Sequence, residues 1–228
     1  MSSPARAAEF LWLTTWVEQR LGACLTFGRG LPWQRMLEGF GMSVSDRPAS
    51  QPGDPHLDSP KIHVGSNGEW GWAIEHFTVE GSKSDTLCRL SSGGAEALSL
   101  TFTQTLSTFF YASDGSIVNG FVLTLPQRRF GSDPDRFDAA MARAGYFDPN
   151  ADHVPAEAAF FLELAFGLKI TEEMLRNVAH TADLPATLLP PTRLPRGGRH
   201  PGPRRAGRGV SKSRVAAITR PRPPGSGT

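Results

Sequence analysis

Cysteine is scarce in this chain, which holds only Cys24 and Cys88 among 228 residues. Two cysteines are too few for a secreted fold stapled by disulfides, and they lack the close spacing of a zinc-binding pair. We therefore expect two reduced thiols and a cytoplasmic location. The chain also lacks a run of about 20 apolar residues, the length that crosses a bilayer, so we expect no membrane partner.

The first apolar stretch, FLWLTTWV, needs a separate explanation, because the LGAC that follows it places Cys24 where a lipoprotein signal is acylated. Glu18 and Arg20 bring charges into a region that must be small and neutral for cleavage. The stretch is also too short to span a bilayer. We interpret it as an amphipathic helix. Its buried face would carry Phe10, Leu13, Trp16 or Val17, and Leu21.

Catalytic signatures are also missing. The sequence has no phosphate-binding loop, dinucleotide fingerprint, nucleophile elbow, zinc-protease helix or CxxC pair. This lowers the expectation of an enzyme, although convergent sites need no signature. Asp133, Asp135 and Asp138 lack the glycine and the distal glutamate of a calcium loop, and Pro134 suits a helix start. We therefore expect no metal and no cofactor.

Acidic residues are absent from the last 38 positions, which hold ten of the 24 basic residues. The other 14 basic and all 22 acidic residues give residues 1–190 a charge near −8. We expect a domain over residues 1–190 and a disordered tail rich in Arg, Pro and Gly over residues 191–228. Three interpretations of the tail stay open: a functionless or out-of-frame extension, a solvated linker, and a nucleic-acid-binding arm. The tail has no aromatic residue to stack on bases.

From Lys61 onward the hydrophobic period is two, which is typical of strands. Clusters of Gly, Ser and Asn separate five runs rich in β-branched and aromatic residues: KIHV, EWGWAIEHF, AEALSLTFT, LSTFFYAS and SIVNGFVLTL. They predict an antiparallel meander of about five strands. Asp114 and Gly115 suit a two-residue primed turn, which would pair residues 107–113 with residues 116–122.

Helices are predicted on both sides of these strands. Before them, a helix over residues 4–22 leads through a short strand, ACLTF, to a second helix, PWQRMLEGF, and then to an exposed loop. After them, three helices begin near Asp133, at Pro155 and after Thr171, the last one over EEMLRNVAHTA. This order predicts a single α+β domain, in which the N-terminal and C-terminal helices cover the sheet.

Several phrases occur together: CLTFGRGLPWQRMLEGFG, GWAIE, STFFYASDGSIVNGFVLTLPQRRFGSDPDR and FGLKITEEMLRN. Over residues 12–175 the chain resembles an uncharacterised bacterial family of domains of unknown function that is common in streptomycete-type genomes. Two features depart from that family: Gly28 stands where a β-branched residue is usual, and the chain continues for almost forty residues past the usual end. The resemblance implies the domain boundaries and no activity.

The phrase FGRGLP holds the first candidate ligand site. It places Arg29, Gly30 and free backbone N–H groups just before a helix, an arrangement that often binds anions. The alternative is an ordinary tight connection between a strand and a helix.

Two histidines, His63 and His76, fall on predicted strands. Adjacent residues of a strand point to opposite faces, so Glu75 cannot easily orient His76. If the two histidines meet across strands, acid–base or metal chemistry becomes open to them; the alternative is a pair of partly buried histidines with ordinary partners.

Three tryptophans are candidate contact residues. Trp70 and Trp72 are two apart on one predicted strand, so they would project from the same face as an aromatic ledge. The alternative for both is a place in the core. Trp33 follows Pro32 at a helix start, where we predict an exposed contact hot spot.

The function is unknown from sequence, and three hypotheses stay open. The preferred one is a non-enzymatic protein-interaction module that recognises a partner through Trp33, Trp70 and Trp72. The second is a small-molecule or anion-binding enzyme that uses Arg29 and a strand histidine, which a pocket joining the two would favour. The third is nucleic-acid binding through the basic tail.

Overall fold

The computed structural model describes residues 8–44, 60–148 and 155–184. All of them belong to the first of the two units into which the chain divides, Met1–Pro190. The predicted tail over residues 191–228 and most of the predicted loop before Lys61 lie outside the described residues.

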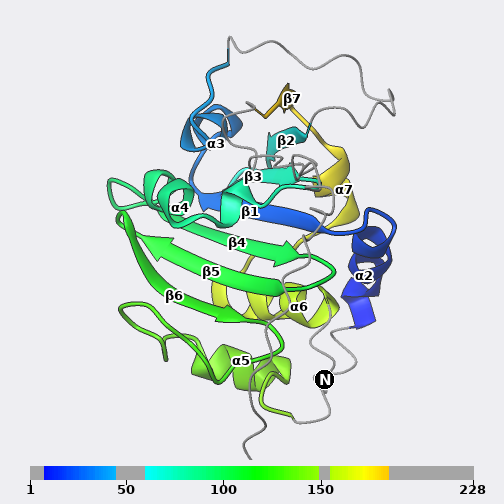
Figure 1. The fold of residues 1–228 in the computed structure, drawn as a ribbon, viewed down its shortest axis with the longest axis vertical. Coiled ribbons are helices and arrows are strands. Elements are labelled where there is room, and N and C mark those ends of the chain that lie inside the picture. Colours follow the sequence, from blue (N-terminus) through cyan, green and yellow to red (C-terminus); the bar gives the residue numbers. More distant parts are fainter. Residues whose placement is uncertain (1–7, 45–59, 149–154, 185–228) are drawn as a thin grey trace, which may run out of the picture. The chain divides into compact units, whose positions relative to one another are not determined.

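The centre of the fold is a seven-stranded antiparallel sheet with the strand order β6-β5-β4-β1-β3-β2-β7 (Figure 1). This confirms the α+β class and the antiparallel sheet. The strands are β1 Ala23–Arg29, β2 Lys61–Ser66, β3 Trp70–Glu75, β4 Glu96–Phe102, β5 Ser107–Ser113, β6 Ser116–Val122 and β7 His180–Asp183.

The predicted count of about five strands is wrong, because the five runs after Lys61 become β2 to β6 and two more strands join them. Strand β1 lies between β3 and β4, with Cys24 opposite both Glu75 and Thr101. A strand with neighbours on both sides and cover on both faces needs apolar residues throughout, as ACLTF has. The sheet is therefore not a simple meander.

Strand β7 corrects a second prediction, the long helix after Thr171. Helix α7 ends at Arg176, and His180–Asp183 instead pairs with β2 and places Ala182 in the core. This pairing satisfies the backbone groups of β2, which would otherwise form an open sheet edge.

The predicted hairpin between β5 and β6 is confirmed. Asp114 and Gly115 form its turn with φ values of 48° and 74°, and Ser113 pairs with Ser116. Both φ values are in the left-handed region that a primed two-residue turn requires.

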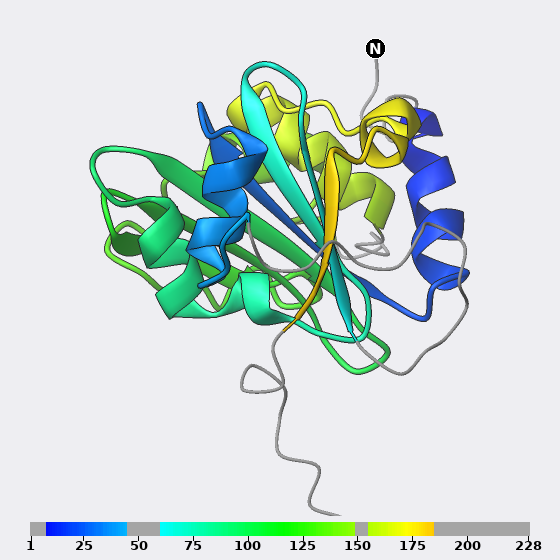
Figure 2. The same ribbon diagram turned by 90° about the horizontal axis from the view of Figure 1, so that it is seen from above.

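Helices cover both faces of the sheet, as Figure 2 shows. One face packs against η1 Ala8–Phe10, α2 Leu11–Glu18, α5 Asp138–Ala144, α6 Pro155–Phe166 and α7 Glu172–Arg176. The other face packs against α3 Trp33–Gly39, η2 Glu80–Ser82 and α4 Ser84–Leu90.

Some helix boundaries differ from the prediction. Helix α5 begins at Asp138, not beside Asp133, because residues 134–137 form a turn. Helix α4 was not predicted at all. Helix α2 ends at Glu18, and Leu21, predicted to be buried, is 66% exposed with φ at +57°, because the chain turns there toward β1.

Strand alternation assigns each side chain of β3 to one face. Trp70, Trp72 and Ile74 lie in the large apolar core under α2, α6 and α7, whereas Ala73 belongs to the smaller core under α3 and α4. Since His76 has the parity of Ile74, its ring lies on the face covered by α2 and α7. Glu75 points the other way, toward η2.

Candidate functional site

Arg29, the predicted anion ligand, is already engaged within the protein. Its guanidinium donates to Glu96 Oε2 at 2.7 Å and to the carbonyl oxygen of Phe166 at 2.7 Å. It also lies 4.7 Å from the ring centre of Trp70. Gly30 has φ at +70°, and its N–H donates to the carbonyl of Glu69. Arg29 therefore ties β1 to β4 and to the end of α6.

The three tryptophans do not share a surface. Trp70 and Trp72 do project from the same face of β3, but helices cover that face, and the two indoles are 2% and 1% exposed. Trp33 packs on the opposite face of the sheet, half-buried, with its ring stacked at 5.3 Å on His180. Partner binding through these residues stays a prediction, and for Trp70 and Trp72 it would require the indoles to leave the core.

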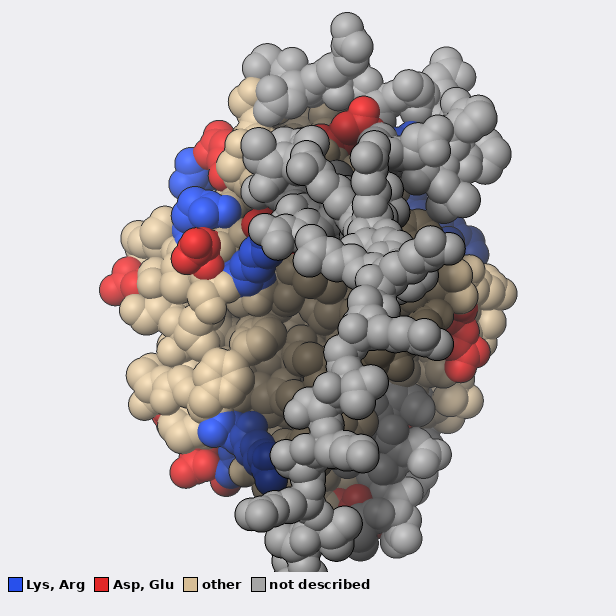
Figure 3. Space-filling view, in the orientation of Figure 1, with Lys and Arg blue, Asp and Glu red and all other residues tan. Residues whose placement is uncertain are grey.

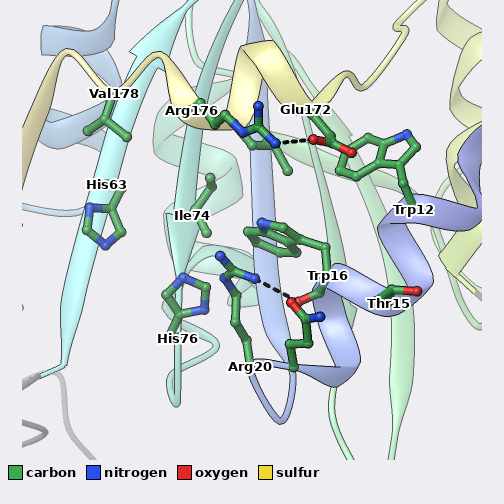
Figure 4. A pocket seen from close by; sticks show the side chains of 12 residues that line it. Trp12, Thr15, Trp16, Arg20, His63, Ile74, His76, Glu172, Arg176 and Val178 are labelled. Carbon is green, nitrogen blue, oxygen red and sulfur yellow. Dashed lines mark hydrogen bonds and ion pairs between the residues drawn. The ribbon is translucent and has the colours of Figure 1, made fainter. Parts of the chain in front are cut away.

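A groove of about 650 Å³ lies between α2 and α7, over the adjoining ends of β2 and β3. Figure 4 shows Trp12, Trp16 and Arg20 on the helix side and His63 and His76 on the strand side. Pockets that hold small ligands are commonly about 300–1,000 Å³. The groove is therefore large enough for a small organic molecule.

His63 and His76 meet across β2 and the end of β3, as one of the sequence alternatives required. Their ring centres are 6.0 Å apart. His63 Nδ1 forms a hydrogen bond of 2.8 Å with Thr181 Oγ1, which fixes the orientation of the ring. Nδ1 of His76 is buried and has no hydrogen-bond partner among the described residues. The pocket that contains them includes Arg20 and not Arg29, which is at the far end of β1.

Both imidazoles are held in the neutral form. Burial, followed by the proximity of His63 and Arg20, lowers the pKa of His76 to about 4. Burial is also the main reason why the pKa of His63 is lowered, and Lys61 and Arg20 add to the effect. At neutral pH the two rings therefore offer hydrogen-bonding atoms and no charge.

Arg20 supplies a positive charge to the groove. Its guanidinium carbon lies 4.3 Å from the ring centre of Trp16, and its Nη1 donates to the carbonyl oxygen of Trp16 at 3.1 Å. No carboxylate of the described residues lies within ion-pair distance of Arg20. Arg176, on the opposite wall, is different because it pairs with Glu172 one helical turn before it. Arg20 is thus the cation that remains available to an anion.

Apolar surface completes the groove. Ile74 on β3 and Leu175 on α7 line it, and the indoles of Trp12 and Trp16 stand along α2 (Figure 4). Small-molecule sites are lined mainly by such side chains, and in this groove they are mixed with polar ones, among them Thr15, Gln19 and Glu172. The arrangement can hold an apolar body beside an anion.

The wall formed by Trp12, Trp16 and Arg20 was missed as a site by sequence reasoning. From the sequence, Trp16 is expected on a helix face, and Arg20 argues only against a signal peptide. A spacing of four residues places Arg20, just past the end of α2, beside Trp16. The packing of that helix over the two histidines depends on contacts between distant segments, such as α2 with α6.

Glu75 occupies a separate buried polar cluster on the other face of the sheet. Its carboxyl group accepts hydrogen bonds from the backbone N–H of Gly81 at 2.7 Å, from that of Glu80 at 2.9 Å and from Thr78 Oγ1 at 2.8 Å. Burial raises the pKa of Glu75. These bonds anchor η2 to β3, so the cluster has a structural explanation. The prediction that Glu75 and His76 point apart is confirmed.

In the view of Figure 3, the described acidic and basic side chains lie in small mixed groups. Within residues 8–44, 60–148 and 155–184, no three His, Cys, Asp or Glu side chains gather as metal ligands would. Among the same described residues, no helix has the length and apolar character needed to span a membrane. Nucleic-acid binding through residues 191–228 stays a prediction.

Comparison with known proteins identifies a family that covers more than half of the chain. A family model described as "Family of unknown function (DUF6461)" matches residues 59–187. No curated protein and no solved structure matches the chain. The matched region contains His63, His76 and α7 but begins after α2, whereas the resemblance noted in the sequence began at Trp12. The two walls of the groove thus come from inside and outside the matched region.

Proposed function

The chain belongs to this family of unknown function, and we propose that it binds a small organic anion in the groove between α2 and α7. The observation that carries the proposal is Arg20, a partly buried guanidinium that stacks on Trp16 and has no carboxylate partner among the described residues. A charge held in place but not neutralised is typical of a site whose counter-ion is the ligand.

The surroundings of Arg20 support an organic anion over a bare inorganic one. The neutral rings of His63 and His76 add hydrogen-bonding capacity without further charge. Ile74 and Leu175 provide apolar contact that an inorganic ion would leave unused. A ligand with one anionic group and an apolar body satisfies both parts of the groove.

Isothermal titration calorimetry of the full-length chain tests this function. The probes are 3-phenylpropionate and its uncharged analogue 3-phenylpropanamide. We expect the acid to bind and the amide to bind at least about tenfold more weakly, because a hydrogen bond between charged groups contributes about 1.5–3 kcal/mol. Equal affinities, or no heat with either probe, would contradict the proposal.

Two variants test whether Arg20 is the side chain that binds the anionic group of the ligand. Arg20→Gln keeps a planar polar group on Trp16 but removes the cation, so we expect it to abolish the preference for the acid. Arg128→Gln is the matched control. Arg128 is exposed beyond the end of β6, which lies at the edge of the sheet far from β2. An Arg20→Gln protein that still prefers the acid would show that another group binds the anion.

A further inference from the structure

The hydrogen bonds of His63 indicate which chemical group, besides the anion, a ligand of this groove carries. This step rests on the proposed function and adds a second recognition group to it. His63 lines the groove, and its Nδ1 is engaged by Thr181. Within the described part of the chain, Nε2 of His63 has no hydrogen-bond partner. One nitrogen of an oriented ring is therefore available to a bound molecule.

The ligand group that meets Nε2 must suit a neutral ring. A neutral imidazole has one N–H donor and one acceptor nitrogen. The Thr181 hydroxyl can accept a hydrogen bond from a protonated Nδ1 or donate one to an unprotonated Nδ1. Nε2 is accordingly an acceptor or a donor, depending on the tautomer. A ligand hydroxyl fits both cases because it donates and accepts. An ammonium group fits less well, because the cationic Arg20 lies in the same groove.

Arg20 and His63 stand on opposite sides of the apolar lining. Figure 4 shows Ile74 and His76 between the guanidinium and the ring of His63. A molecule that reaches both groups must extend past Ile74 and the neutral ring of His76. We infer that the ligand is a hydroxycarboxylate with an apolar body, whose carboxylate binds Arg20 and whose hydroxyl bonds with Nε2 of His63.

Matched pairs of acids test this inference by calorimetry on the full-length chain. Each pair differs by one hydroxyl at the end remote from the carboxylate: 3-hydroxypropionate and propionate, (4-hydroxyphenyl)acetate and phenylacetate, 3-(4-hydroxyphenyl)propionate and 3-phenylpropionate. For the pairs with a phenyl body we expect the hydroxy acid to bind about tenfold more tightly or better, because a site built around a hydrogen bond rejects the analogue that lacks it. Equal affinity within every pair would overturn the inference and leave the proposed function intact. If no acid binds, both fall.

Variants of His63 test whether this side chain forms the hydrogen bond with the ligand hydroxyl. His63→Leu keeps much of the side-chain volume and loses both ring nitrogens, so it should bind 3-phenylpropionate as the unmodified chain does and lose the preference for 3-(4-hydroxyphenyl)propionate. His63→Gln retains a group that donates and accepts, so it should keep part of the preference. A preference that survives in His63→Leu would assign the hydroxyl to a different side chain and refute this role of His63.

Discussion

His76 should make the folded protein sensitive to mild acid. Its pKa is lowered from 6.5 to about 4 in the folded chain, because burial and the neighbouring His63 and Arg20 disfavour the imidazolium. An unfolded chain exposes this ring to water, where the ordinary value applies. Between these two pKa values the unfolded state binds more protons than the folded state, so the stabilising contribution is complete above pH 6.5 and is lost as the pH falls through 4.

The magnitude follows from the size of the shift. One pKa unit corresponds to about 1.4 kcal/mol, so the ring lowers the free energy of unfolding by about 2 kcal/mol at pH 5 and about 3 kcal/mol at pH 4, relative to pH 8. His63, whose pKa is also lowered, acts in the same direction. Glu75, with a raised pKa, acts in the opposite direction, since its contribution is complete at low pH and is lost as the pH rises.

Urea unfolding at pH 8, 6.5, 5.5 and 5 measures this effect through far-ultraviolet circular dichroism. We expect His76→Gln to flatten the loss of stability between pH 8 and pH 5 by about 2 kcal/mol, because glutamine does not titrate. Arg176→Gln is the control, since arginine stays charged over this range and the slope should not change. Parallel pH profiles for the unmodified chain and His76→Gln would refute the assignment.

Three further substitutions test the fold by urea denaturation. Gly81→Ala should destabilise the protein by about 1–3 kcal/mol, because the added Cβ would overlap Thr26 Oγ1 and lie 2.9 Å from Glu75 Oε1; a change below about 0.5 kcal/mol would mean that η2 can shift freely. Arg29→Met should lower the free energy of unfolding by about 1–3 kcal/mol, since it breaks two charge-assisted hydrogen bonds; unchanged stability would argue against a structural role for Arg29. Leu21→Gly should raise it by about 0.5–1 kcal/mol, because φ at +57° suits glycine and the leucine is largely exposed; a loss of stability would show that the exposed leucine contributes more than its strained backbone costs.

The fold was predictable from sequence where the signal is local. The Asp114–Gly115 turn and the five runs after Lys61 carry their strand signals within a few residues, and all five form strands. The place of β1 between β3 and β4 depends on pairings with segments more than 40 residues away. Strand β7 forms because β2 needs a partner at its edge, a requirement that His180–Asp183 alone does not reveal.

The candidate site was less predictable for the same reason. Residue types drew attention to Arg29 and Trp70, whose charge and indole are used to hold the protein together. Strand parity correctly placed Glu75 and His76 on opposite faces. Arg20, which lines the same groove as the two histidines, is distant from them in sequence, and the packing of α2 brings it close to them. Sequence patterns predict which face of a single helix or strand is apolar. The groove lies where the faces of distant elements meet, which no local pattern predicts.

Binding in the groove can be observed most directly through the five indole N–H signals in a ¹H–¹⁵N correlation spectrum of the full-length chain, assigned with single Trp→Phe variants. On titration with 3-(4-hydroxyphenyl)propionate, we expect shifts for Trp12 and Trp16, which line the groove, and stationary signals for Trp33, Trp70 and Trp72. Shifts of Trp33, Trp70 or Trp72 with Trp12 and Trp16 unmoved would contradict this expectation.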